Sequence, residues 1–351
     1  MKNIIFTGVS GSGRIELLEE LAEVIRKRRK SVHIHDLGNK IFEAANALQI
    51  HITDQKILDI DHNLLLALRK IAVLSVVQDM INNPVDINFI GIHATFRWKG
   101  RLIDGINLRD LSNFNADSII NVVDDVTRIL DTNKKNKKWE DSEIPDIKDT
   151  NDWMMEEQFL TDIIANFLDI PCYVIGRKHN IENLTDLILS EKPKIYLSYP
   201  ITAIKDANPE LLERIQNDYL QELEKRFIVF NPLVIEDLKN AGKISKLPSA
   251  ALQGMKTRTV DRDYHFIDQS DFVIVVYLTE KVSSGVLSEI IYASTHGKNV
   301  YMIYPFKLSP FIEEYTTIIF NDFSNLLQYF DSDEFKNRLT KSKINFGLFK
   351  S

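Results

Sequence analysis

The chain opens with the stretch NIIFTGVSGSGRI at residues 3–15. Residues 3–7 are rich in apolar side chains and predict a buried strand, and a loop of glycines and serines follows directly. From residue 14 apolar side chains recur at helical spacing, which predicts a helix. Glycines let backbone N–H groups turn inward, and a helix N-terminus adds partial positive charge that suits phosphate. The sequence therefore predicts a phosphate-binding loop; its residues are Gly8, Gly11, Gly13 and Arg14.

The same alternation of short apolar strands and amphipathic helices continues along the chain. It is typical of α/β layers around parallel sheets. We expect strands at residues 3–7, 32–37, 87–92, 118–123, 194–198, 227–230, 272–277 and 299–304, and note a further apolar segment at 172–175. The polar stretch 131–152 is expected to form a loop or lid. A new strand–helix rhythm begins after Glu191-Lys192-Pro193, so we expect two parallel-sheet domains, residues 1–190 and 191–351.

Composition excludes several classes of protein. The 351 residues include 43 basic and 50 acidic side chains, a net charge of −7 that argues against a general nucleic-acid binder. The lone cysteine, Cys172, excludes an intrachain disulfide and fits a reducing compartment. No apolar run approaches the ~20 residues that span a bilayer, and the first residues lack a signal-peptide core. We expect a cytoplasmic protein without a nucleic-acid or membrane partner.

The glycine loop departs from the full phosphate-loop pattern G-x-x-x-x-G-K-[ST]. Gly8 and Gly13 have the required spacing, but Arg14 stands in place of the lysine and Ile15 in place of the hydroxyl residue. Lysine in this pattern reaches the terminal phosphates and the hydroxyl holds magnesium. An arginine can contact phosphate, whereas an isoleucine cannot bind magnesium.

Most of residues 1–190 resembles the archaeal-type adenylate kinase family. The resemblance depends on the glycine loop, on His93-Ala94-Thr95 and on Asn115-Ala116-Asp117. The family usually has an aspartate where this chain has Gly91, and lid arginines where it has Arg128 followed by lysines. The resemblance thus implies a P-loop kinase-like domain that has lost groups needed for phosphoryl transfer. It leaves open the binding of ATP or another nucleotide, and nucleoside-monophosphate kinase activity as an alternative.

Three motifs stand out after residue 191. IYLSYP at residues 195–200 ends a strand, DRDY at 261–264 lies at a helix, and SSGVLSE at 283–289 opens another helix that starts near Ser284. Strand-end loops are the usual ligand position in an open α/β sheet. Together the motifs resemble the nucleoside 2-deoxyribosyltransferase family, including its branch of nucleoside 5′-monophosphate N-glycosidases. The resemblance covers residues 193–330 and implies a Rossmann-like or flavodoxin-like fold.

The resemblance also implies roles for individual residues. Glu289 matches the nucleophile that attacks the anomeric carbon, Asp263 the aspartate that assists at the sugar or base, and Tyr196 a tyrosine of the base pocket. The chemistry is reasonable in itself, because a carboxylate can stabilise or trap an oxocarbenium-like centre and a second one can manage protons. Structural alternatives stay open: Asp263 can stabilise a helix dipole, and Tyr196 can be a core aromatic.

Serines bear on the substrate of this second half. Ser283 stands six residues before Glu289, where enzymes of the family that act on free nucleosides commonly have aspartate. Serines and helix-start amides suit a phosphate, which favours the monophosphate branch and assigns Ser283, Ser284 and Gly285 to substrate binding. Ser309 resembles a serine that this branch supplies from a neighbouring subunit; each serine can also be a helix cap or turn residue. Tyr199 and Thr202 depart from the branch, which usually has glycine and arginine there.

The sequence thus predicts an enzyme that cleaves the N-glycosidic bond of a (deoxy)nucleoside 5′-monophosphate and releases the free base. Alternatives are base exchange between deoxynucleosides, and phosphoryl transfer or nucleotide sensing by the first domain. The substrate is a small nucleotide, no metal ligand is assigned, and the glycosidase chemistry requires no cofactor. ATP or another nucleotide is expected only at the first domain. The family resemblance implies a homodimer or higher homo-oligomer.

Overall fold

The computed structural model describes residues 1–136, 143–235, 249–307 and 309–339. The chain divides into two compact units. The first unit consists of Met1–Ser190 and Leu233–Arg262, and the second of Glu191–Pro232 and Asp263–Ser351. Each unit is built around its own parallel sheet, which confirms the α/β class with two parallel-sheet domains.

The first unit contains a five-stranded parallel sheet in the order β2-β3-β1-β6-β7. Its strands are β1 (Lys2–Thr7), β2 (Val32–Asp36), β3 (Ile87–Gly91), β6 (Ser118–Val123) and β7 (Cys172–Gly176). A separate antiparallel pair, β4 (Thr95–Trp98) and β5 (Arg101–Asp104), follows β3. The central strands are buried over nearly their whole length, as expected for a parallel sheet covered on both faces.

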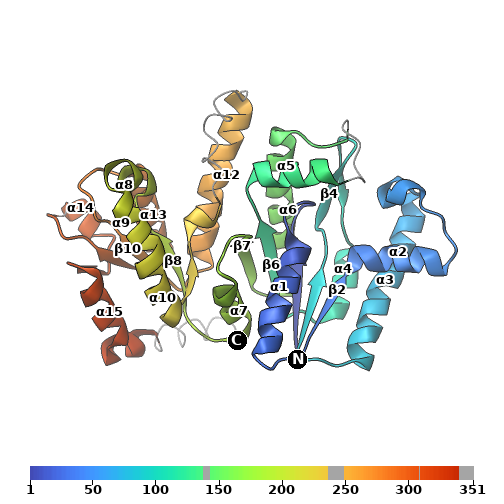
Figure 1. The fold of residues 1–351 in the computed structure, drawn as a ribbon, viewed down its shortest axis with the longest axis horizontal. Helices are drawn as coiled ribbons and strands as arrows, with labels where there is room; N and C mark the ends of the chain where they lie inside the picture. The colour runs from blue at the N-terminus through green and yellow to red at the C-terminus, as the bar shows by residue number, and fades with distance from the viewer. Residues whose placement is uncertain (137–142, 236–248, 308, 340–351) are drawn as a thin grey trace. The chain divides into compact units, whose positions relative to one another are not determined.

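Helices cover both faces of this sheet (Figure 1). They are α1 (Arg14–Lys27), α2 (Leu37–Ala47), α3 (His62–Asn82), α4 (Leu108–Leu111), α5 (Val126–Lys135), α6 (Ile147–Leu168) and α7 (Ile181–Leu189). Several begin at an aspartate or asparagine whose side chain accepts a hydrogen bond from a first-turn N–H, which satisfies donors that have no partner inside the helix. Asp36 caps α2 in this way, Asp61 caps α3 and Asp146 caps α6.

The second unit has a parallel sheet in the order β12-β11-β10-β8-β9. Its strands are β8 (Lys194–Ser198), β9 (Ile228–Phe230), β10 (Phe272–Val276), β11 (Asn299–Ile303) and β12 (Ile318–Phe320). Numbered within the unit, the order reads 2-1-3-4-5, which is the flavodoxin-like arrangement. The helices are α8 (Ile201–Ala207), α9 (Pro209–Arg214), α10 (Leu220–Arg226), α13 (Ser284–Thr295), α14 (Pro310–Glu313) and α15 (Phe323–Asp331). A π-helical turn, Ile215–Tyr219, joins α9 to α10.

Every strand expected from the sequence is present, but the polar stretch 131–152 is not the loop that we predicted. Helix α5 runs on to Lys135. Most of its polar side chains lie on one face of the helix, while the opposite face buries Val126, Ile129 and Leu130. Helix α6 already begins at Ile147, where the Asp146 side chain accepts a hydrogen bond from the Asp149 N–H at 2.8 Å. Residues 137–142 lie outside the described residues.

The assignment of residues 233–262 also needs correction. The sequence places them in the second domain, whereas the described residues of this segment, 233–235 and 249–262, belong to the first unit. Helix α12 (Ser249–Asp268) begins in that segment, and its Met255 packs against Val126 and Ile147. A Cβ on Gly176, at the end of β7, would lie 2.5 Å from a Val234 methyl group, so glycine allows the returning chain to pass closely. This packing joins residues far apart in sequence, which the sequence pattern does not reveal.

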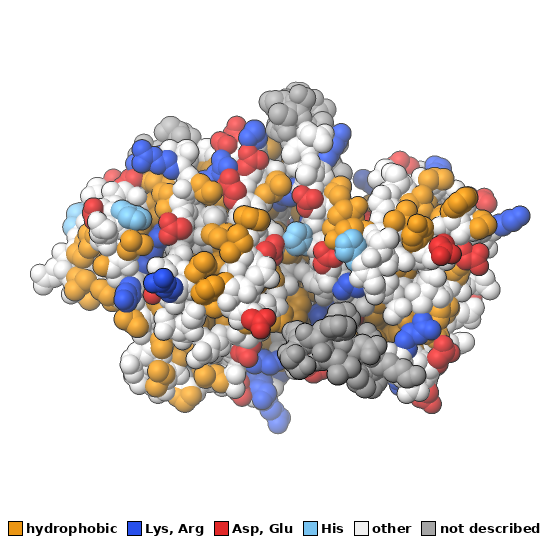
Figure 2. Space-filling view, turned by 180° about the vertical axis from the view of Figure 1, so that it is seen from behind, with side chains coloured by type: hydrophobic (Ala, Val, Ile, Leu, Met, Phe, Trp, Pro, Cys, Tyr) orange, Lys and Arg blue, Asp and Glu red, His pale blue; other side chains and the backbone are white. Residues whose placement is uncertain are grey.

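The surface offers a mixture of chemical types. Acidic, basic and apolar side chains are interspersed over the face drawn in Figure 2. Within the described part of the chain, none of the helices combines the length and the apolar character needed to traverse a bilayer.

Aromatic rings form much of the core of the second unit. Phe272 is 1% exposed, and its ring centroid lies 5.4 Å from that of Phe227 and 5.3 Å from that of Tyr301. Both pairs are close to perpendicular, a favourable geometry for aromatic contacts. By contrast, the chain's tryptophans all lie within residues 1–190, at positions 98, 139 and 153. Tryptophan fluorescence therefore reports on the first unit alone.

We predict that Phe272→Ala destabilises the second unit by about 3–5 kcal/mol, because it leaves a cavity where a buried ring stood. Urea unfolding followed by far-UV circular dichroism should show an earlier transition, while the tryptophan transition stays unchanged. Phe89→Ala, which removes a fully buried ring of the first unit, is the matched control and should move the tryptophan transition. Equal movement of both signals in Phe272→Ala would contradict separate cores.

Candidate functional site

The glycine loop of the first unit lies between β1 and α1, as the sequence predicts. Gly8, Gly11 and Gly13 all have positive φ, at 146°, 84° and 72°. Gly13 is the residue before α1 and has left-handed backbone, and no side chain caps that end of the helix. Such a loop at the start of a 14-residue helix is the backbone arrangement that favours an anion.

Arg14 takes a different position from the phosphate contact that the sequence suggests. Its side chain is buried, and its Nη1 donates to the carbonyl oxygens of Gly8, at 3.2 Å, and of Ile92. Its Nη2 lies 3.4 Å from Nε2 of His93. Burial lowers the pKa of the guanidinium. The side chain therefore connects the glycine loop to the end of β3, and its guanidinium group points into the protein interior.

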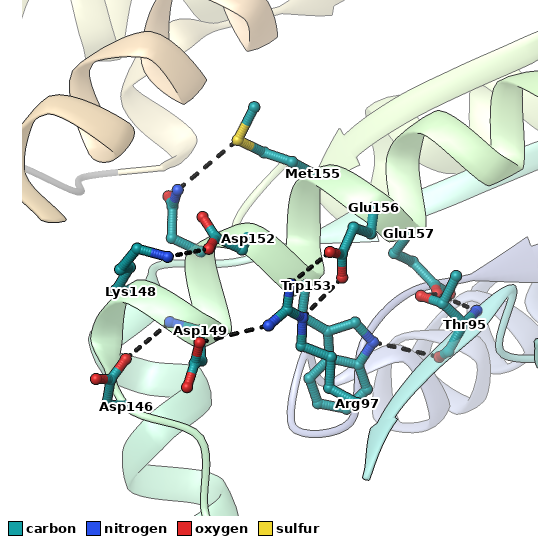
Figure 3. A network of polar contacts seen from close by, with 11 residues as sticks. Thr95, Arg97, Asp146, Lys148, Asp149, Asp152, Trp153, Met155, Glu156 and Glu157 are labelled. Carbon is teal, nitrogen blue, oxygen red and sulfur yellow. Dashed lines mark hydrogen bonds and ion pairs between the residues drawn. The ribbon is translucent and has the colours of Figure 1, made fainter. Parts of the chain in front are cut away.

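A carboxylate that the sequence did not single out lies beside the loop. Glu157 of α6 is 1% exposed, and its Oε1 accepts from the N–H groups of Gly8 and Ala94, both at 2.9 Å. Its Oε2 accepts from the Thr95 N–H at 2.6 Å and from the Thr95 hydroxyl at 2.7 Å (Figure 3). Burial raises the pKa of Glu157, and these hydrogen bonds oppose the rise. Glu157 thus supplies an internal anion for four donors.

Helix α5 rests on the glycine loop. Asn133 is 1% exposed and donates from Nδ2 to the carbonyl oxygen of Ser10 at 3.1 Å. A Cβ on Gly11 would lie 2.7 Å from Oδ1 of Asn133 and 2.9 Å from the Ile129 carbonyl oxygen. The loop therefore needs glycine at position 11 for close packing as well as for its backbone angle.

An apolar pocket lies beside the end of β3, with a volume of about 50 Å³. Its walls include Leu37, Ile41 and Phe96, together with the polar side chains Arg69 and His93. Arg69 is 3% exposed and donates to Asp104 at 3.3 Å, while burial lowers its pKa. Burial and the neighbouring Arg14 hold the pKa of His93 well below its usual value, which keeps the ring neutral. Pockets for drug-sized ligands measure roughly 300–1,000 Å³, so this one is small.

In the second unit, the structure brings Glu289 to the carboxyl end of the sheet. Glu289 lies in α13 and is half-buried, and its Oε2 accepts a hydrogen bond from Oγ of Ser198 at 2.5 Å. Ser198 is the last residue of β8. Strand β8 pairs with β10 on one side and β9 on the other, so the strand order reverses there. Ligands of open α/β sheets bind at such a switch point.

The other predicted residues of the SSGVLSE motif form the start of α13. The backbone N–H of Ser283 donates to the Tyr277 hydroxyl at 2.8 Å, and its Oγ accepts weakly from the Val286 N–H at 3.5 Å. Ser284 and Gly285 are exposed, and a Cβ on Gly285 would meet no atom within 4 Å. The N-terminus of α13 is therefore open, as a phosphate site requires.

Asp263 is half-buried in α12. The neighbouring ring of Tyr264 stacks on Tyr292 of α13 with centroids 4.0 Å apart, which pairs the two helices. Tyr196 is fully buried within β8, and its ring lies 6.4 Å from that of Phe266, a core position. Ser309 is exposed and precedes α14 without a capping hydrogen bond from its side chain.

Sequence reasoning assigned no metal ligand, but the structure groups three side chains that could hold one. His33 and His35 of β2 lie with Asp79 of α3, and one ligand atom of each lies within 4.8 Å of the other two. The alternation His-x-His within an expected strand was a signal that both rings share one face.

Comparison with known proteins gives little further assignment. No protein-family model matches the chain, and no curated protein matches it. A shikimate kinase from Acinetobacter baumannii, in complex with shikimate, is similar over 54% of this chain and 91% of its own, with 12% identity and a TM-score of 0.32. A shikimate kinase from Bacteroides thetaiotaomicron covers 54% of this chain and 98% of its own, with 11% identity and a TM-score of 0.34. Such low values assign no activity, and the resemblance of residues 193–330 to deoxyribosyltransferases stays a prediction.

We predict that Gly11→Ala destabilises the first unit more than Gly100→Ala does. Both glycines have positive φ, at 84° and 73°, so both substitutions strain the backbone by about 1 kcal/mol. Only at Gly11 would the new methyl group also collide with Asn133 and Ile129, because nothing lies within 4 Å of a Cβ on Gly100. Urea unfolding followed by tryptophan fluorescence measures the difference; equal losses would show that α5 does not rest on the loop.

Proposed function

We propose that the second unit cleaves the N-glycosidic bond of a (deoxy)nucleoside 5′-monophosphate and releases the free base. The observation that supports this is the position of Glu289. Its carboxylate is half-buried and receives the Ser198 hydroxyl at 2.5 Å, at the switch point of a sheet with flavodoxin-like strand order. This is where a ligand-directed carboxylate is expected, and a surface glutamate needs no such partner.

The chemistry assigns one task to each group around this carboxylate. As the glycosidic bond breaks, positive charge develops at the anomeric carbon, and Glu289 stabilises that charge or forms a covalent bond to the carbon. Ser198 holds one carboxylate oxygen in place from the end of β8. The open start of α13, with Ser283 and Ser284, receives the 5′-phosphate, because helix-start N–H groups favour an anion. Asp263 manages the proton of the leaving base or holds a sugar hydroxyl.

Base exchange is the closest alternative within this chemistry. It uses the same nucleophile, but a second base instead of water attacks the glycosyl intermediate. The proposal also includes a homo-oligomer in which Ser309 reaches the site of a neighbouring subunit.

Base release from a panel of nucleoside monophosphates and free nucleosides, measured by chromatography, tests the proposal. Wild type should release base from a monophosphate without added metal, and Glu289→Gln should lower the rate at least about 10²–10⁴-fold, as expected for loss of a group that acts in the transition state. Ser198→Ala should lower kcat less strongly, because it removes only the positioning hydrogen bond. Glu280→Gln, on an exposed residue of the loop before α13, is the matched control and should keep full activity.

Absence of base release from every substrate by folded wild-type protein would overturn the proposal. Release that Glu289→Gln does not reduce would remove Glu289 from the mechanism. Product in which a second added base replaces the first would assign the chain to base exchange.

A second candidate function rests on the first unit. We propose that it binds a nucleotide without transferring phosphate. The three glycines with positive φ at the start of α1 support anion binding. Ile15 offers no magnesium ligand and Arg14 is turned into the core, so neither of these two loop positions neutralises charge as the lysine and hydroxyl residue of the full pattern do.

We expect AMP or ATP to bind with an affinity that magnesium does not increase, and no ADP to form from AMP and ATP. Isothermal titration with and without magnesium measures the first expectation, and chromatography the second. Gly13→Val should weaken binding, since a β-branched residue disfavours the left-handed backbone at φ 72°. ADP formation by wild type would contradict the proposal and make the first unit a kinase.

A further inference from the structure

Two histidines and an aspartate of the first unit meet at the edge of its sheet. His33 and His35 are two residues apart on β2, so their side chains leave the strand on the same face. Strand β2 is an edge strand, and Asp79 comes from α3 (Figure 1). One ligand atom from each of the three side chains lies within 4.8 Å of the other two.

A buried chain of hydrogen bonds sets which ring nitrogen of His35 bears hydrogen. Nδ2 of Asn3 donates to the Phe114 carbonyl oxygen at 2.8 Å, and Nδ2 of Asn88 donates to Oδ1 of Asn3 at 2.9 Å. The Asn88 oxygen therefore faces His35, whose Nε2 lies 3.2 Å away. Because that oxygen can only accept, Nε2 is the nitrogen with the hydrogen, and Nδ1 of the neutral ring presents a lone pair.

That lone pair faces a carboxylate. Nδ1 of His35 lies 3.6 Å from Oδ2 of Asp79. The other carboxylate oxygen, Oδ1, accepts from Nδ2 of Asn83 at 2.7 Å, which turns Oδ2 toward the ring. The separation of 3.6 Å exceeds that of an ordinary N–H···O bond, about 2.7–3.2 Å. Two electron-rich atoms so oriented repel each other unless a cation lies between them.

A proton or a metal ion can fill this position, and the spacing favours the metal. A protonated ring would donate to the carboxylate at about 2.7–3.2 Å, which is shorter than the observed 3.6 Å. Zinc–ligand bonds of about 2.0–2.1 Å in a tetrahedron separate neighbouring ligands by about 3.3–3.4 Å, close to the observed value.

We propose that His33, His35 and Asp79 bind a divalent transition-metal ion, with zinc the best match to two imidazoles and a carboxylate. The ring nitrogen opposite the metal bonds to Asn88, an outer partner of the kind that fixes the ring of a metal-binding histidine. Asp79 is 40% exposed, so the site is accessible from solvent and leaves room for a water molecule as a fourth ligand.

Such an ion would connect the edge strand to α3. Strand β2 leads directly into α2, and Leu37 and Ile41 of α2 face Leu65 and Arg69 of α3 across the small apolar pocket. Fixing β2 to α3 would hold those pocket walls together. The metal is therefore expected to stabilise the first unit, and it is independent of the chemistry proposed for Glu289.

The test uses the full-length protein, freed of metal with a chelator and titrated with zinc chloride by calorimetry. We expect one tight site per chain, and a higher midpoint for the tryptophan-monitored unfolding transition when zinc is bound. His33→Ala and Asp79→Asn should each abolish this site. Asn88→Ala should weaken zinc binding about 10–100-fold, the usual loss when an outer partner of a ligand is removed. His51→Ala, on an exposed histidine outside the cluster, is the matched control and should bind as wild type does.

Cobalt substitution gives an independent readout, because visible absorption distinguishes a site with imidazole and carboxylate ligands from hydrated cobalt. No stoichiometric zinc binding, or unchanged binding in folded Asp79→Asn, would overturn the proposal. A doubly protonated His35 ring at neutral pH, seen by NMR in metal-free and zinc-saturated protein alike, would show that a proton fills the position and would also overturn it.

Discussion

The Glu157 carboxylate is the contact on which the glycine-loop end of the first unit depends. It accepts from the N–H groups of Gly8, Ala94 and Thr95 and from the Thr95 hydroxyl, which joins β1, the segment after β3 and α6. Removing the Glu157 carboxylate would leave several buried donors without an acceptor, each at a cost of about 1–3 kcal/mol. Trp153, one turn earlier on α6, donates from Nε1 to the Thr95 carbonyl oxygen at 3.2 Å (Figure 3). The strand ends are thereby fixed from within.

The two units differ in how the polar groups at their strand ends are paired. In the first, donors and charges at the strand ends largely satisfy each other, with Glu157 bound to backbone N–H groups and Arg14 to carbonyl oxygens. In the second, Glu289 has Ser198 as a partner, and the start of α13 is exposed. An internally neutralised strand end suits binding or a structural role, whereas a half-buried carboxylate beside an open helix start suits chemistry on a small anionic substrate.

Apolar runs were sufficient to predict most strands of the two parallel sheets, because a parallel sheet buried on both faces requires them. The edge strand β12 and the β4–β5 pair were not predicted. Helices in polar stretches were harder to predict from the sequence. The pattern of 131–152 indicated a loop, yet α5 and α6 extend into it, since a helix needs only one apolar face and a cap such as Asp146. The glycine loop was predictable from spacing, but the direction of Arg14 was not. Its carbonyl partners belong to residues 8 and 92, and only the folded sheet brings them together.

The sequence by itself determined most of the strands and their succession along the chain, the α/β class, the glycine loop between a strand and a helix, and the placement of Glu289 on a helix. These follow from local periodicity and from the backbone freedom of glycine. Tertiary structure alone decided which side chains meet. Glu157 is 149 residues from Gly8, Ser198 is 91 residues from Glu289, and Asp79 joins two histidines of another element. Such contacts depend on strand order and helix packing, which are properties of the whole chain, so no local pattern encodes them.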